Sequence, residues 1–217
     1  MLPSLSRLSV RGPPQGPSIG AGTGEGDISN EERVVWLHIV QRCWIRLQYA
    51  SAGVKDDHEV MLAAVAKDGL ALQYASPRLK DNPEVVLAAV TQNGTALKYA
   101  SDELKEDRGV VLAAVTQDGD ALRYASAELQ GNREVVLAAV KQDGNTLGLA
   151  SDDLQADQQV VLAAVTEDGG ALEHASDELK ADREVVLAAA KRNDKWLKYA
   201  SDELKNEFMA DREVVLF

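Results

Sequence analysis

The sequence predicts an all-α fold: a right-handed α-solenoid of about seven 25-residue repeats, with two helices in each repeat. Three features support this prediction. Tyrosine, serine and leucine recur at a step of 25 residues, an Asp or Asn precedes most of the long apolar runs, and a glycine follows most of them. One such repeat cannot bury its own apolar surface, whereas stacked copies bury it between them.

Residues 31–217 are built from this repeat. The complete units span 31–55, 56–80, 81–105, 106–130, 131–155, 156–180 and 181–205, and a partial unit at 206–217 opens with a four-residue insertion at 206–209. The tyrosine step runs through Tyr49, Tyr74, Tyr99 and Tyr124, passes Leu149 and His174, and resumes at Tyr199. Because so regular a step does not arise by chance, it is the strongest structural signal in the chain.

Residues 1–30 differ in composition from the rest of the chain. They contain six of the 16 glycines, four of the six prolines and five serines. Because Pro and Gly disfavour packed elements, we expect a disordered Gly/Pro/Ser-rich tail. We favour an intracellular location for the protein. Because no acidic residue precedes Glu25, the tail could alternatively be a segment that targets the protein to an organelle.

The first helix of each unit is expected to begin at an N-cap and to end at a glycine. In unit 106–130, Asp107 is the N-cap, and Gly119 lies where a left-handed residue would end the helix. The segment between them predicts a helix of about eleven residues and about 16 Å. Its six consecutive apolar residues, 110–115, span more than one turn, so we expect burial on most sides, with Leu112 in the core.

The second half of each unit predicts a shorter helix and a tight turn. In the same unit, residues 120–126 present one apolar face, and residues 127–130 form a turn that Leu129 anchors to the core. The tyrosines are expected to lie half-buried between units, with the hydroxyl at the edge. Acidic residues that follow the serine predict a stripe along the stack, which suits helix starts and could also attract a basic partner. They are Asp102, Glu103, Asp152, Asp153, Asp177, Glu178, Asp202 and Glu203.

The two ends of the repeat region depart from the pattern. In unit 31–55, Cys43 and Trp44 replace the usual Asp-Gly pair and Trp36 enters the first helix, so bulky side chains are expected to cap the stack. The last four residues are half of a helix without a partner. We expect them to fold back, to be the cut end of a longer chain, or to support self-association. They are Val214, Val215, Leu216 and Phe217.

Charge and hydropathy weigh against two kinds of partner. The 35 acidic and 23 basic residues give a formal charge of −12. Nucleic-acid binding requires clustered Lys and Arg, so we expect no nucleic-acid partner. The longest apolar run, residues 60–66, is far shorter than the ~20 residues that span a membrane, so we expect no membrane partner.

The residue types of enzyme and metal sites do not converge in this sequence. The single cysteine, Cys43, cannot form an internal disulfide. Together with His38 and His58 it lacks the spacing of a metal or nucleophile set. Asp118 and Asp120 flank Gly119 without the ligand spacing of a calcium loop. We therefore expect no enzyme, no catalytic residue, no metal and no cofactor.

The repeated string D-R-E-V-V-L-A-A-V-x-x-D-G-x-A-L-x-Y-A-S-D-E-L-K resembles the tandem repeats catalogued as domain of unknown function 4116. The resemblance covers residues 31–217 and is strongest in unit 181–205. It implies tandem helical repeats and no established activity. The sequence departs from the family pattern in the first unit, at Leu149 and His174, at Asp194 in place of glycine, and at the insertion.

These features favour a non-enzymatic protein-interaction scaffold of unknown partner, which binds through an extended face of the solenoid. Polar residues vary on one side of the second helices while their neighbours stay constant, and repeat scaffolds often present a binding surface in this way. A structural or self-assembling element, or a fragment whose active domain is absent, remains the alternative. The candidate protein-binding residues are Gln73, Lys98, Asp120, Arg123, Glu173, Lys195 and Lys198.

Overall fold

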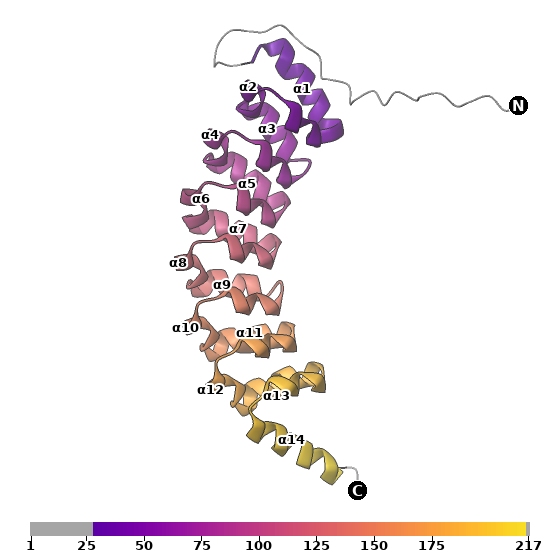
Figure 1. The fold of residues 1–217 in the computed structure, drawn as a ribbon, viewed down its shortest axis with the longest axis vertical. Helices are drawn as coiled ribbons and strands as arrows, with labels where there is room; N and C mark the ends of the chain where they lie inside the picture. Colours follow the sequence, from indigo (N-terminus) through magenta and orange to yellow (C-terminus); the bar gives the residue numbers. More distant parts are fainter. Residues whose placement is uncertain (1–27, 216–217) are drawn as a thin grey trace, which may run out of the picture.

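The computed structural model describes residues 28–215, apart from the side chains of residues 192, 209 and 211–215. Within this range helical segments follow one another in an elongated, gently curved stack, and none of the described residues forms a strand (Figure 1). The all-α prediction is therefore confirmed. Most of the predicted tail, residues 1–27, lies outside the described residues, as do Leu216, Phe217 and the side chains of Val214 and Val215.

The first segment of each unit is a main helix. It starts at the predicted Asp or Asn N-cap in every complete unit except the first, where Ser29 caps the helix. The Asp107 carboxylate accepts the Val110 N–H at 2.9 Å, and the Asn132 side chain accepts the Val135 N–H at 3.2 Å. These short side chains satisfy donors that the first turn leaves unpaired. The main helices are α1 (Asn30–Cys43), α3 (His58–Val65), α5 (Pro83–Gln92), α7 (Arg108–Gln117), α9 (Arg133–Val140), α11 (Gln158–Glu167) and α13 (Arg183–Arg192).

The second segment is a 3-10 helix, where the sequence predicts a short helix of unspecified type. In its η4 copy, the extended Asp118 (φ −152°, ψ 111°) accepts the Asp120 N–H on its side chain and the Ala121 N–H on its carbonyl, both at 3.0 Å. The carbonyl bond spans three residues and so begins a 3-10 turn. These helices are η1 (Trp44–Tyr49), η2 (Gly69–Tyr74), η3 (Gly94–Tyr99), η4 (Gly119–Tyr124), η5 (Gly144–Leu149), η6 (Gly169–His174) and η7 (Asp194–Tyr199).

The third segment is a short α-helix, where the sequence predicts only a tight turn. Ser126 Oγ accepts the Leu129 N–H at 3.4 Å, and the Ser126 N–H donates to the Lys105 carbonyl of the preceding unit at 3.1 Å. The serine step therefore joins adjacent units through the backbone. The short helices are α2 (Ala52–Lys55), α4 (Pro77–Lys80), α6 (Asp102–Glu106), α8 (Ala127–Gln130), α10 (Asp152–Gln155) and α12 (Asp177–Lys180). The longer α14 (Asp202–Val215) continues through the insertion.

The segments form two rows and an edge. Each main helix packs on the next one, the 3-10 helices form a second row, and the short helices lie along one edge (Figure 1). The core lies between the rows. Val110, Val111, Ala114 and Val115 of α7 and Leu122 of η4 are all at most 2% exposed.

Leu112 is not a core residue, and in this respect the expectation from sequence is wrong. It is only partly buried, and its equivalent Leu87 is 38% exposed. Successive helical residues turn by about 100°, so six apolar residues in a row point in every direction. The two rows of helices cover only the side that carries the valines and the second alanine. Leu112 and Ala113 therefore face the open side.

The glycine that recurs every 25 residues allows adjacent units to approach closely. The prediction that it ends the helix in a left-handed conformation is wrong. None of the glycines that begin η2 to η6 has a φ in the left-handed region. A Cβ atom on Gly119 would lie 2.7 Å from the Ala139 carbonyl oxygen of the next main helix, and one on Gly169 would lie 2.7 Å from that of Ala189. Only glycine allows the backbones this close.

Replacement of leucines by alanine is expected to destabilise the fold more at core positions than on the open side. Leu122→Ala removes a fully buried side chain and should lower the free energy of unfolding by about 2–5 kcal/mol. Leu112→Ala should cost less than half as much, because its side chain is already partly in water. Urea unfolding followed by circular dichroism measures both, with Lys98→Ala as a near-neutral control. Equal losses at the two leucines would contradict the packing described above.

Glycine replacements are expected to depend on the presence of a following unit. Gly119→Ala should destabilise the stack by more than about 2 kcal/mol, because the new methyl group collides with a main-chain carbonyl that cannot swing aside. Gly109→Ala is the matched control, since Gly109 lies in α7 at a position that carries Glu in several other units. It should stabilise by up to about 1 kcal/mol. Thermal melting of both variants tests the difference in sign.

Candidate functional site

One side of the main-helix row exposes apolar side chains in unit after unit. Each of α3, α5, α7, α9 and α11 turns one leucine and the following alanine to this side, and these residues are partly buried or exposed. We call this surface the Leu–Ala face. It consists of Leu62, Ala63, Leu87, Ala88, Leu112, Ala113, Leu137, Ala138, Leu162 and Ala163.

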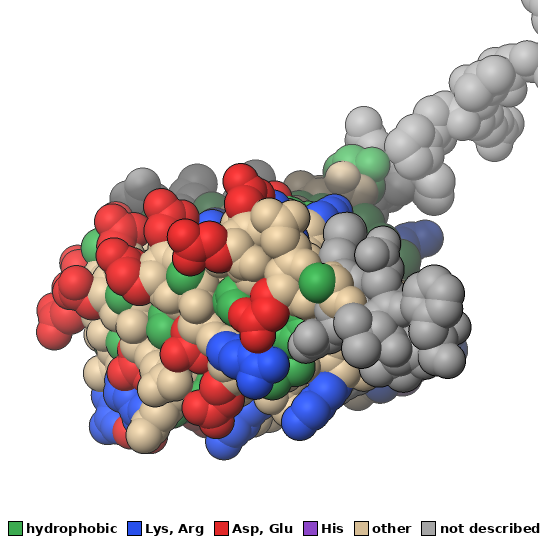
Figure 2. Space-filling model, turned by 90° about the horizontal axis from the view of Figure 1, so that it is seen from below, with side chains coloured by type: hydrophobic (Ala, Val, Ile, Leu, Met, Phe, Trp, Pro, Cys, Tyr) green, Lys and Arg blue, Asp and Glu red, His purple; other side chains and the backbone are tan. Residues whose placement is uncertain are grey.

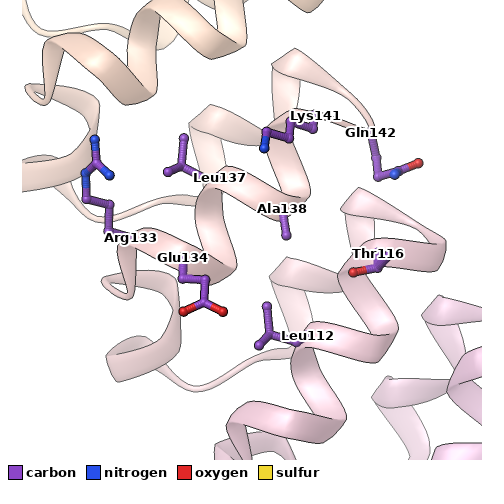
Figure 3. Close-up of a pocket in the computed structure, with 8 residues that line it drawn as sticks. All are labelled: Leu112, Thr116, Arg133, Glu134, Leu137, Ala138, Lys141 and Gln142. Carbon is purple, nitrogen blue, oxygen red and sulfur yellow. The ribbon is translucent and has the colours of Figure 1, made fainter.

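The Leu–Ala face is grooved between neighbouring helices. A groove of about 590 Å³ lies between α7 and α9, with Leu112, Leu137 and Ala138 on its walls (Figure 3). Arg133 and Glu134 lie at one end, and Thr116, Lys141 and Gln142 line the remainder. A neighbouring groove of about 480 Å³ shares Leu112 and Thr116 with the first. Apolar side chains of two adjacent units therefore line the first groove, and polar side chains border it.

Ion pairs join successive main helices along one border of this face. Arg33 Nε lies 2.8 Å from Asp57 Oδ2, and His58 Nε2 lies 3.2 Å from Glu84 Oε2. Further along the stack, Arg108 pairs with Glu134, Arg133 with Asp157 at 3.3 Å, and Arg183 with Glu207 at 3.2 Å. Each pair connects one unit to the next. Two of the groups that border the groove, Arg133 and Glu134, are thus engaged in contacts between units.

The candidate residues predicted from sequence all lie on the other row, on the 3-10 helices. Gln73 is in η2, Lys98 in η3, Asp120 and Arg123 in η4, Glu173 in η6, and Lys195 and Lys198 in η7. All are exposed except the half-buried Gln73. Three of them have partners within their own 3-10 helix: Arg123 lies 3.1 Å from Asp120, and the Gln73 side-chain amide donates to the Leu70 carbonyl at 3.0 Å.

The last unit carries an aromatic and basic cluster on the same row. The Trp196 and Tyr199 rings stack with centroids 6.2 Å apart, and the Lys195 ammonium lies 4.1 Å from the Trp196 ring. The Tyr199 hydroxyl, with a further contribution from Glu173, raises the pKa of Lys198. Tyr74, Tyr99 and Tyr124 are half-buried as predicted, whereas Tyr49 is 68% exposed.

The predicted acidic stripe runs along the short helices. All of its members are exposed, and Figure 2 shows acidic side chains gathered on the flank of the stack where the short helices lie. Lys105 lies 3.0 Å from Asp102, and Lys205 lies 3.0 Å from Asp202. The backbone N–H of Glu178, with a further contribution from the Ser176 hydroxyl, lowers the pKa of the Glu178 carboxyl, which suits the start of a helix. These contacts fit solvated helix starts.

The histidines and the cysteine of the first two units lie on main helices. His38 and Cys43 are exposed on α1, and His58 pairs with Glu84. Among the described residues, no three His, Cys, Asp or Glu side chains are grouped to hold a metal ion. No helix between residues 28 and 215 combines the length and the apolar character needed to cross a bilayer.

The Leu–Ala face is the feature that inspection of the sequence missed. The signal was present, because a helix with six apolar residues in a row must turn one of them toward whichever side has no neighbour. Which residue faces outward follows only from the positions of the adjacent units. The sequence therefore located the variable polar residues of the 3-10 row and overlooked the constant apolar ones.

The N-cap of α11 should contribute stability that depends on pH. The Val160 N–H lowers the pKa of the Asp157 carboxyl, with further contributions from Arg133 and the Gln159 N–H. Because the pKa is lower in the folded chain, the ionised carboxylate stabilises the fold above the unfolded value of about 3.9. That stabilisation is lost as the pH falls through the folded value.

Asp157→Asn is the corresponding test, because Asn132 already caps α9 in the same geometry. At pH 7 the variant should unfold at a lower urea concentration than the wild type, because the substitution removes the ion pair with Arg133. The difference between the two urea midpoints should disappear as the pH falls below about 4. A difference that stays constant down to pH 2.5 would show that ionisation of Asp157 makes no contribution.

Comparison with known proteins agrees with the repeat pattern. The model of the family described as domain of unknown function (DUF4116) matches residues 35–80, 57–105, 107–155, 157–205 and 182–217. Neither a curated protein nor a solved structure matches the chain. The resemblance noted from the repeated string is thus confirmed. Because these overlapping matches cover nearly all of residues 35–217, the chain belongs to the DUF4116 family.

Proposed function

We propose that the chain is a non-enzymatic protein-binding scaffold, a right-handed solenoid of seven complete 25-residue units. Its Leu–Ala face receives an amphipathic helix of another protein, with the apolar side of that helix in the grooves between main helices. The mechanism is shape and apolar complementarity over several units, without a chemical step.

The repeated exposure of leucine supports this function most directly. The core positions of α5, α7, α9 and α11 are filled by valine and alanine, whereas the leucine packs only partly against this core and keeps part of its surface in water. A polar side chain at that position would be better hydrated. A contiguous apolar surface bordered by polar groups is typical of an interaction site.

The chemistry of the groove defines the partner more closely. Its walls, Leu112 and Leu137, suit aliphatic or aromatic side chains spaced three or four residues apart on a helix. Glu134 and Arg133 already pair with residues of neighbouring units, whereas Lys141 at the other end is exposed. An acidic residue beside the apolar side of the bound helix would pair with Lys141.

The pairing of the border groups also favours binding over catalysis. Arg133 donates to Asp157 and to Gln159, at 3.3 and 2.6 Å, and these bonds hold the helices together. A general acid, base or nucleophile has to be directed at a bound molecule. The groove therefore fits recognition better than a reaction.

A capture experiment with matched variants tests the proposal. The immobilised full chain is compared with Leu112→Gln/Leu137→Gln on the Leu–Ala face and with Lys98→Ser/Arg123→Ser on the 3-10 row. Captured proteins are identified and quantified by mass spectrometry. Both pairs lie in central units and reach solvent, so circular dichroism should show an unchanged fold. The leucine variant should retain at least about 10-fold less partner, since two contact residues typically cost more than 1 kcal/mol together.

The other outcomes are equally informative. Loss of the partner in the 3-10-row variant alone would place the binding surface on Lys98 and Arg123, as the variable polar residues suggest. Retention by both variants would exclude both surfaces. A captured partner whose contacting segment, mapped by cross-linking, is not an amphipathic helix would contradict the groove mechanism.

A further inference from the structure

The first main helix presents an uncovered stacking surface at the N-terminal end of the stack. In α3, Val60 is fully buried, because α1 covers that side of the helix. The equivalent residue of α1 is Val35, which is 36% exposed because no main helix precedes it (Figure 1). Helix α1 thus retains the shape of an interior unit on a side where it has no neighbour in the described chain.

Unit 31–55 exposes more large apolar side chains than any other unit of the described chain. Of the five large apolar side chains that are most exposed, four belong to unit 31–55: Val34 at 64%, Val35 at 36%, Ile45 at 47% and Tyr49 at 68%. A groove of about 570 Å³ runs over the outer side of α1, lined by Val34, Val35, His38, Ile39, Arg42, Cys43 and Arg46. Patches of this kind are typical of protein interfaces.

Opposite charges stand at the two ends of the patch. Glu31 and Glu32 lie in the first turn of α1, Arg42 lies in its last turn, and Arg46 follows in η1. Glu31, Val35 and Arg42 are separated by four and seven residues, so they lie on one side of the helix. Among the side chains that the structure describes, no ion pair joins these four charged residues to any other group, whereas Arg33 pairs with Asp57.

We propose that α1 pairs with α1 of a second copy, antiparallel, about a two-fold axis near His38 and Ile39. This arrangement places Glu31 and Glu32 of each copy against Arg46 and Arg42 of the other. A parallel pair would place like charges together. The apolar residues of the two copies meet between the charged ends, and both halves of the interface are the same surface, as two-fold symmetry requires.

The proposed dimer is small and should be weak. Helix α1 is about 21 Å long, so the buried area falls at the low end of specific interfaces, below about 1,200 Å². The dimer would join two stacks end to end. It would carry two Leu–Ala faces, and a bivalent target would then bind with a gain in avidity.

Charge reversal provides the test. In the first variant Arg42 and Arg46 are both changed to Glu, and in the second Glu31 and Glu32 are both changed to Arg. Sedimentation equilibrium of the full chain from about 5 to 500 µM should show a monomer–dimer equilibrium for the wild type. Each variant alone should dimerise at least about 10-fold more weakly, because both ends of its interface carry like charges. An equimolar mixture should form a heterodimer, since every pair is then complementary.

Recovery in the mixture also guards against misfolding, because an unfolded α1 could not restore the interface. A wild-type chain that stays monomeric over the whole concentration range would overturn the proposal. Dimerisation that appears only after deletion of residues 1–27 would show that this segment covers α1 in the full chain. Dimers that persist in both variants would place the contact elsewhere.

Discussion

The stack depends on one close contact, which recurs at the junctions between interior units. The first residue of each 3-10 helix η2 to η6 lies against a carbonyl oxygen of the next main helix. A side chain at this point would hold the two backbones apart, so glycine sets the distance between units. The Gly69 N–H also donates to the Gln92 side chain of the next unit at 2.6 Å. The junction is therefore a polar backbone contact as much as an apolar one.

The remaining repeated residues act around that contact. The serine N–H bonds to the preceding unit, Asp or Asn caps the main helix, and valine and alanine fill the space between rows. The serine bond joins two units, whereas each cap acts within its own unit, three residues along the chain. The outward leucine and alanine pack only partly against this core, and we propose that their exposed surface contacts another molecule. This division of roles supports the scaffold function that we propose.

The two ends show what happens where a neighbouring main helix is missing. Asp194 replaces the usual glycine in the last complete unit, where no further 25-residue unit follows directly. Trp196 replaces the small residue of the other units, and its ring lies over Gly169 and Gly170. At the first end, α1 keeps apolar residues outward and carries opposite charges at its two ends. Trp196 thus fills the space against the preceding 3-10 helix, and the outer side of α1 is the surface that we propose meets a second copy.

The sequence by itself determined the period, the N-caps of the main helices and the family, because these depend on residue types at fixed spacing along the chain. Only the tertiary structure decided why glycine is required, as Gly119 meets Ala139 in a different unit. The same holds for Leu112, which looks like a core residue in the sequence and lies on the open side of its helix. Burial and close approach are set by neighbours that are distant along the chain, and a local pattern does not contain their positions.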